Sequence, residues 1–144
     1  MEIVVGFVDT VPGRRALEAA TAQARAHGGR LHVIVHAGAT VGEHASQVRE
    51  LDEGVGEAAQ RLDAVVAELA ADGLDVTGEV LRDHRGSAGE TIVDYASRCE
   101  ADLVVVGVRQ RSKVGKLLLG SDLQDVILGA PCSVLAAKGG DPPG

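Results

Sequence analysis

The sequence predicts an α/β fold in which a parallel sheet is covered by crossover helices. Five short apolar runs alternate with four segments of helical character along the 144 residues, and this alternation is typical of repeated strand–helix–strand units. Aromatic residues are almost absent, since Phe7 and Tyr95 stand alone and there is no tryptophan. The core must therefore consist of Val, Leu, Ile and Ala, which suits helices that pack closely on a sheet.

The apolar runs are the predicted strands and cover residues 3–8, 31–35, 76–81, 103–106 and 134–137. The first and the fourth are continuous aliphatic runs, which are typical of strands buried on both faces. The third alternates apolar and polar residues, so we expect an edge strand with one face in water.

The predicted helices cover residues 14–27, about 43–72, 88–99 and 121–129. In the second, apolar residues from Val48 to Leu69 recur at alternating steps of three and four and form one stripe. A coiled-coil seam has the same spacing, but the flanking strands favour a helix that covers a sheet. Pro12 suits the first turn of the first helix, and Gly28-Gly29 suits its end.

Composition and charge argue against several classes of protein. The formal net charge of −7 disfavours general nucleic-acid binding, which relies on neutralising phosphates. No apolar run approaches the ~18 residues of a membrane span, and the acidic start lacks the features of a signal peptide. We therefore expect a cytoplasmic protein that binds neither nucleic acid nor membrane. In a reducing cytosol, Cys99 and Cys132 are expected to be ordinary buried thiols.

The length fits a single domain. Residues 1–138 are predicted to form it, because no internal repeat and no second domain is visible. Residues 139–144 have the Gly and Pro content of a linker, and we expect them to be a flexible tail.

The stretch from Gly107 to Ser121 is the best candidate for a binding site. It follows the fourth predicted strand, and open parallel sheets bind ligands at the carboxyl ends of their strands. Gly120-Ser121 begins the last helix, where free N–H groups and the helix dipole attract anions. The stretch is also basic, with Arg109, Arg111, Lys113 and Lys116 and no acid between residues 102 and 122. It is either a cradle for phosphate or a solvated basic loop.

Residues 107–121, together with residues 122–127 and 130–135, resemble the carboxyl-terminal signature of universal stress proteins. The nucleotide-binding form of that signature reads G-x2-G-x9-G-[ST]. The resemblance extends to residues 3–9, 31–37 and 86–93. It implies a Rossmann-like, open five-stranded parallel sheet of order 3-2-1-4-5 with helices on both faces. It also implies ATP or another adenine nucleotide as ligand, with or without Mg²⁺, and a homodimer.

The resemblance also implies which residues hold the nucleotide. Asp9 would contact the nucleoside, and the backbone of Ala37 would line the adenine pocket. Gly107 would approach the ribose and phosphates, and Gly120 and Ser121 would hold the phosphates. The candidate set is completed by Val106, Arg109 and Gln110.

Two of these positions have alternative interpretations. Gln110 stands where the motif has its second Gly, and its side chain either blocks the approach of the backbone or donates its own amide to phosphate. Asp9 could instead be the N-cap of the helix that follows it.

No catalytic residue and no metal site is predicted. The histidine spacings match no zinc motif, and neither a G-x-S-x-G sequence nor a hydrolytic pair of carboxylates is visible. The predicted function is therefore a nucleotide-binding regulator with at most weak ATPase activity. The alternative is a dimeric stress-response scaffold that binds no nucleotide. A homodimer through the last strand is expected in either case, because residues 133–137 form an edge with no inward charge or proline.

Overall fold

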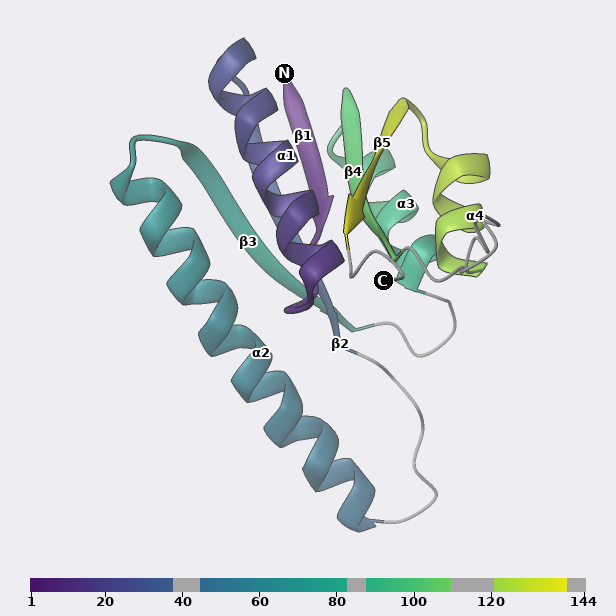
Figure 1. Cartoon of the computed structure of the whole chain (residues 1–144). Coiled ribbons are helices and arrows are strands. Elements are labelled where there is room, and N and C mark those ends of the chain that lie inside the picture. The colour runs from purple at the N-terminus through teal and green to yellow at the C-terminus, as the bar shows by residue number, and fades with distance from the viewer. Residues whose placement is uncertain (38–44, 83–87, 110–120, 140–144) are drawn as a thin grey trace, which may run out of the picture.

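The computed structural model describes residues 1–37, 45–82, 88–109 and 121–139. For Ala37, residues 45–55, Arg82 and Ser121 it describes the backbone alone. It contains a parallel sheet of order β3-β2-β1-β4-β5 (Figure 1). The strands are β1 (Glu2–Gly6), β2 (Arg30–Ala37), β3 (Asp75–Arg82), β4 (Leu103–Arg109) and β5 (Ser133–Gly139). The predicted fold class and strand order are confirmed.

The sheet is covered on both faces. The helices are α1 (Val11–His27), α2 (Ala45–Ala71), α3 (Ala88–Arg98) and α4 (Ser121–Gly129). In Figure 1, α1 and α2 lie on one face, and α3 and α4 lie on the other. Each pair of helices buries its own apolar cluster against the sheet, with Ile3, Val5 and Val105 under α1 and Val4 and Val104 under α3 and α4.

Small side chains set the packing of α1 on the sheet. Ala16, Ala20 and Ala24 recur one turn apart along the helix and are buried. Alanines on the contact face let the helix backbone approach the sheet closely. On the same face of the sheet, Gly78 of β3 does the same for α2, because a Cβ there would lie 2.7 Å from Val66 Cγ2. The expected core of small aliphatic residues is confirmed.

Both ends of α1 are capped, but the N-cap is not Asp9. Thr10, rather than Asp9, is the N-cap: its backbone is extended (φ −134°, ψ 169°), and its hydroxyl accepts the N–H of Gly13 at 3.2 Å. Pro12 lies in the first turn, as expected. Gly28 ends the helix in the left-handed conformation (φ 66°). The interpretation of Asp9 as the cap is therefore wrong.

Strand lengths also differ from prediction. β1 ends at Gly6 instead of Val8, because the chain turns there toward the cap of α1 and leaves Val8 exposed. β5 runs beyond residue 137 and includes the exposed Lys138. Within the described residues, no helix is long and apolar enough to cross a membrane.

Candidate functional site

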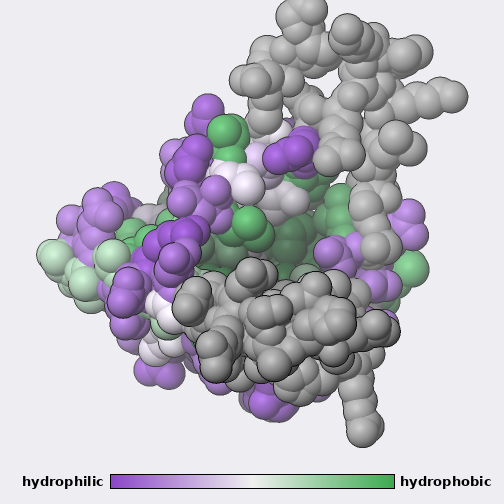
Figure 2. Space-filling model, turned by 90° about the horizontal axis from the view of Figure 1, so that it is seen from below, coloured by the Kyte–Doolittle hydropathy of each residue, from purple (hydrophilic) through white to green (hydrophobic). Residues whose placement is uncertain are grey.

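A cavity of about 260 Å³ lies at the carboxyl ends of β1 and β4. Figure 2 views the molecule from this end and shows a hollow with hydrophobic residues at its bottom. The position is the one that an open parallel sheet favours, because β2 and β4 lie on opposite sides of β1 and the connections leave in opposite directions. The cavity is therefore the candidate site.

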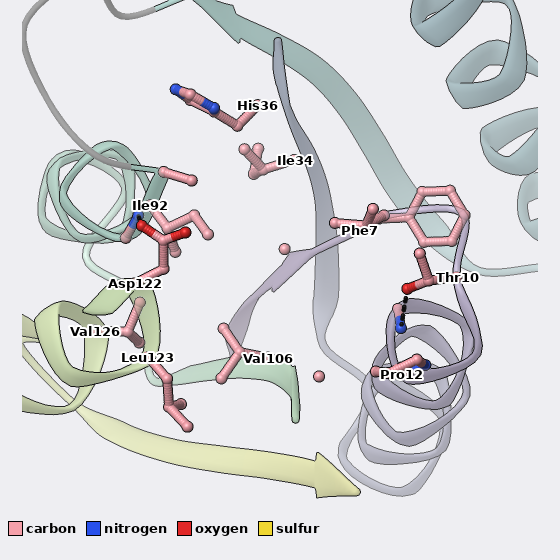
Figure 3. A pocket seen from close by; sticks show the side chains of 16 residues that line it. Phe7, Thr10, Pro12, Ile34, His36, Ile92, Val106, Asp122, Leu123 and Val126 are labelled. Carbon is pink, nitrogen blue, oxygen red and sulfur yellow. Dashed lines mark hydrogen bonds between the residues drawn. The ribbon is translucent and has the colours of Figure 1, made fainter. Parts of the chain in front are cut away.

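The floor of the cavity is apolar and comes from both the sheet and the helices (Figure 3). β2 and β4 contribute Ile34 and Val106, and α3 contributes Ile92. α4 adds Leu123 and Val126. All five are at least nine-tenths buried, so the floor is shaped by the same side chains that form the core. A flat apolar group suits such a floor better than a charged one does.

The start of α1 forms one wall with Thr10, Pro12 and Gly13. Pro12 has no N–H, and the N–H of Gly13 is already bonded to the Thr10 hydroxyl. These two first-turn positions therefore offer no free donor to a ligand.

Gly107 of β4 lines the cavity next to Pro12. A Cβ at Gly107 would lie 2.6 Å from the Pro12 carbonyl carbon and 3.0 Å from its Cβ. Real Cβ atoms do not approach a backbone this closely, so the wall could not keep its shape. The absence of a side chain at Gly107 is thus explained by the packing of α1 on β4.

Among the described residues, the opposite wall has two polar side chains. Asp122, in the first turn of α4, accepts the N–H of Gly89 on its Oδ1 at 3.3 Å. His36, near the end of β2, also lines the cavity, and its Nε2 is buried without a hydrogen-bond partner. Figure 3 shows both side chains on the α3 side of the cavity.

The structure brings some of the predicted site residues together and separates others. Val106 and Gly107 line the cavity. Asp9 lies beyond the residues that line it and pairs with Arg14 at 2.9 Å. Arg109 is exposed at the end of β4, and Ala37 ends β2.

The remaining predictions concern the basic stretch. Ser121 is the first residue of α4. Gln110 and Gly120 lie outside the described residues, and so do residues 140–144 of the expected tail. Gly107, the first residue of the stretch, and Asp122, the residue directly after it, both line the cavity.

Several lining residues were not among the predicted ones, namely Thr10, Ile34, His36, Ile92, Asp122 and Leu123. The apolar ones carry no signal that separates a cavity wall from ordinary core. Asp122 has such a signal, because an acid directly after Gly120-Ser121 lies in the first turn of the predicted helix.

No group of three or more His, Cys, Asp or Glu side chains that could hold a metal occurs among the described residues. Cys99 and Cys132 are free and partly buried. Burial raises the pKa of both thiols above the usual value, which disfavours the reactive thiolate form. The expectation that both are ordinary packed thiols fits these surroundings.

An open parallel sheet with an apolar cavity at its switch point defines the class of doubly wound α/β domains, in which this position is the usual place for a ligand. The model of the universal stress protein family matches residues 1–138. A universal stress protein of Thermus aquaticus is 34% identical over 139 residues, which cover 94% of this chain and 97% of the relative. This chain belongs to the universal stress protein family.

Solved structures agree with this assignment. The universal stress protein of Archaeoglobus fulgidus superimposes with a TM-score of 0.74 at 29% identity, over 94% of this chain and 97% of that one. A structure of the Archaeoglobus fulgidus protein in complex with dAMP superimposes with a TM-score of 0.69 at 25% identity, over 94% and 96% of the two chains.

Proposed function

We propose that this protein binds an adenine nucleotide in the cavity at the carboxyl ends of β1 and β4, and that it acts as a binding regulator rather than a committed enzyme. The observation that carries the proposal is the cavity itself, which combines an apolar floor with a polar wall at the start of two helices. The dAMP complex of the Archaeoglobus fulgidus protein supports the choice of an adenine nucleotide.

The shape of the cavity suggests how the ligand is oriented. Its volume of about 260 Å³ lies below the roughly 300 Å³ at which ligand pockets commonly begin, so a whole nucleotide must extend past the described walls. The base and ribose suit the apolar floor around Ile34 and Val106. In this proposal Gly120 and Ser121 bind the phosphates, and Asp9, Ala37, Arg109 and Gln110 complete the set of residues proposed to contact the nucleotide. The proposed ligand is ATP or another adenine nucleotide, with or without Mg²⁺.

The test is a thermal melt and a calorimetric titration with dAMP, AMP, ADP, ATP and cyclic AMP, each with and without Mg²⁺. A ligand at 100 times its Kd adds about 2.7 kcal/mol to the stability of the native state. For a chain of this length that corresponds to a rise in Tm of roughly 5 to 10 °C. A protein that shows neither heat nor a shift at millimolar concentrations of all five ligands would contradict the proposal.

A matched pair of variants on α4 locates the site. Leu123 is buried in the cavity wall, so Leu123→Phe should fill the cavity and remove most of the ligand-induced shift. Leu128 lies on the same helix with 85% of its surface exposed, so Leu128→Phe should leave the shift unchanged. The shift is compared with the melting point of each variant without ligand, which corrects for any loss of stability. Equal shifts in the two variants would place the ligand elsewhere.

We also propose a homodimer through β5 as the assembled form, in the cytoplasm. β5 is an edge of the sheet, and its exposed residues include Ala136 and Lys138. Unpaired edges favour pairing with a second chain, and two-fold dimers are the commonest closed assemblies. Lys138 adds a charge near the end of the strand, so we expect the pairing to centre on residues 133–137.

Light scattering at tens of micromolar should give the mass of two chains. Ala136→Glu places a charge at the centre of the proposed interface and should shift the mass toward that of one chain. Ala22→Glu adds the same charge at an exposed position of α1 and should leave the dimer intact. A wild-type monomer would refute the dimer. A dimer without any nucleotide binding would instead favour the dimeric scaffold.

A further inference from the structure

The cavity already contains an anion of the protein itself. Asp122 lies in the first turn of α4 and lines the cavity, and Figure 3 shows its carboxylate among the cavity residues. One carboxylate oxygen accepts the N–H of Gly89 at 3.3 Å. Gly89 belongs to the first turn of α3, so a carboxylate in the first turn of α4 caps the start of α3.

The two helix starts are in direct contact. A Cβ at Gly89 would lie 3.0 Å from Asp122 Cα, so the backbones can come this close only because residue 89 has no side chain. The N-terminus of an α-helix carries a partial positive charge, and its first N–H groups have no partner within the helix itself. These groups are the ones that would attract a phosphate. The Asp122 carboxylate therefore occupies part of the field that a phosphate would use.

The described residues of the cavity walls carry little positive charge that could offset the Asp122 carboxylate. Among the described residues that line the cavity, Asp122 is the one with a formal charge, and His36 is the other titratable side chain. Arg14, in the first turn of α1, is paired with Asp9. Asp122 is exposed, but a phosphate brought to the start of α4 would still meet its carboxylate at close range, and the two negative charges would repel each other.

We infer that Asp122 is a specificity-determining residue that limits the negative charge of the ligand. The cavity then prefers a nucleoside or a nucleotide with a single phosphate over free ATP. This inference rests on the proposed function for the adenine part of the ligand. The effect of the Asp122 charge on the binding of an anion does not require an adenine group.

The test is the substitution Asp122→Asn, which removes the charge and keeps an oxygen that can accept the Gly89 N–H. Free ATP, without Mg²⁺, should bind about tenfold more tightly to the variant, which corresponds to about 1.4 kcal/mol. The affinity for adenosine should change by less than about twofold. The gain for ATP should shrink as NaCl is raised, because salt screens the repulsion that the substitution removes.

Asp63→Asn is the matched control. Asp63 is exposed on α2, and its substitution removes the same charge from the protein as a whole. This control should change neither the affinity for ATP nor the affinity for adenosine. Asp122→Ser is a second variant, in case the amide finds a new contact, and it should shift ATP binding in the same direction. Circular dichroism and the melting point of each variant show whether the fold is kept.

A second measurement separates this inference from the proposed function. Inorganic tripolyphosphate has no base, and it should raise the Tm of Asp122→Asn more than that of wild type. If it does so while no adenine compound binds either protein, the adenine assignment fails and the role of Asp122 stands. If Asp122→Asn changes ATP and adenosine binding equally, the charge selection is wrong. Weaker ATP binding by the variant, confined to Mg²⁺-containing buffer, would instead make Asp122 a metal ligand and also overturn the inference.

Discussion

Replacing Ile34 with alanine should lower the free energy of unfolding by about 2 to 5 kcal/mol, which is the usual range for truncating a fully buried aliphatic side chain. Ile34 lies on β2 with 1% of its surface exposed and packs in the cluster beneath α3 and α4. It also forms part of the floor of the cavity. Its removal therefore joins a new void to an existing one, and the neighbouring strands leave little room for collapse.

Urea unfolding followed by far-UV circular dichroism measures the effect. The matched control is Ile127→Ala on α4, where 47% of the side chain is exposed, and it should cost less than about 1 kcal/mol. Equal losses in the two variants would show that Ile34 is less tightly packed than its burial indicates. Ile34→Ala also enlarges the cavity, so a larger apolar ligand should bind this variant more tightly than it binds the wild type.

The fold class and the order of helices and strands along the chain could be predicted from local patterns. Each strand is an apolar run bounded by turn residues, and each helix has its own apolar stripe, so the alternation alone indicates parallel strands with crossover helices. The strand order came from the family resemblance, because periodicity does not say which strands are neighbours. The boundary errors lie where a tertiary contact decides, as at Val8, where the chain leaves the sheet to reach the cap of α1.

The candidate site was predictable only in part. Val106 and Gly107 could be placed because they end a central strand, and central strand ends lie at the switch point. The helical wall could not be placed, since Ile92 and Leu123 look like any other apolar residues on a buried helix face. Whether such a residue lines a cavity depends on how α3 and α4 pack together on their face of the sheet, which is a non-local property. Asp9 was expected to face the ligand, but in the structure its carboxylate pairs with Arg14.

Gly107 connects the fold to the site, because it has two competing explanations. The family resemblance implies that glycine is needed there so that the ribose and phosphates can approach the backbone. The structure offers packing as the reason, because a Cβ would lie 2.6 Å from the carbonyl carbon of Pro12. The first explanation predicts a loss of ligand binding with unchanged stability of the free protein. The second predicts that the free protein itself is destabilised.

We expect the second outcome. Gly107→Ala should lower the free energy of unfolding without ligand by about 1 to 3 kcal/mol, as overpacking does in a well-packed region. The atoms in the way belong to the backbone at the start of α1, so relief requires that α1 move away from β4. That movement would also displace Thr10 and Pro12 from the cavity wall, so nucleotide affinity should fall together with stability.

The control for this substitution is Gly56→Ala on α2, where a Cβ would meet nothing within 4 Å. It should stabilise the protein by about 0.5 to 1 kcal/mol, because alanine is the better helix former. Urea unfolding of the wild type and both variants, in the absence of ligand, decides between the explanations. If Gly107→Ala keeps wild-type stability and loses only nucleotide binding, the glycine serves the approach of the ligand. The contact with Pro12 would then be loose enough to admit a methyl group.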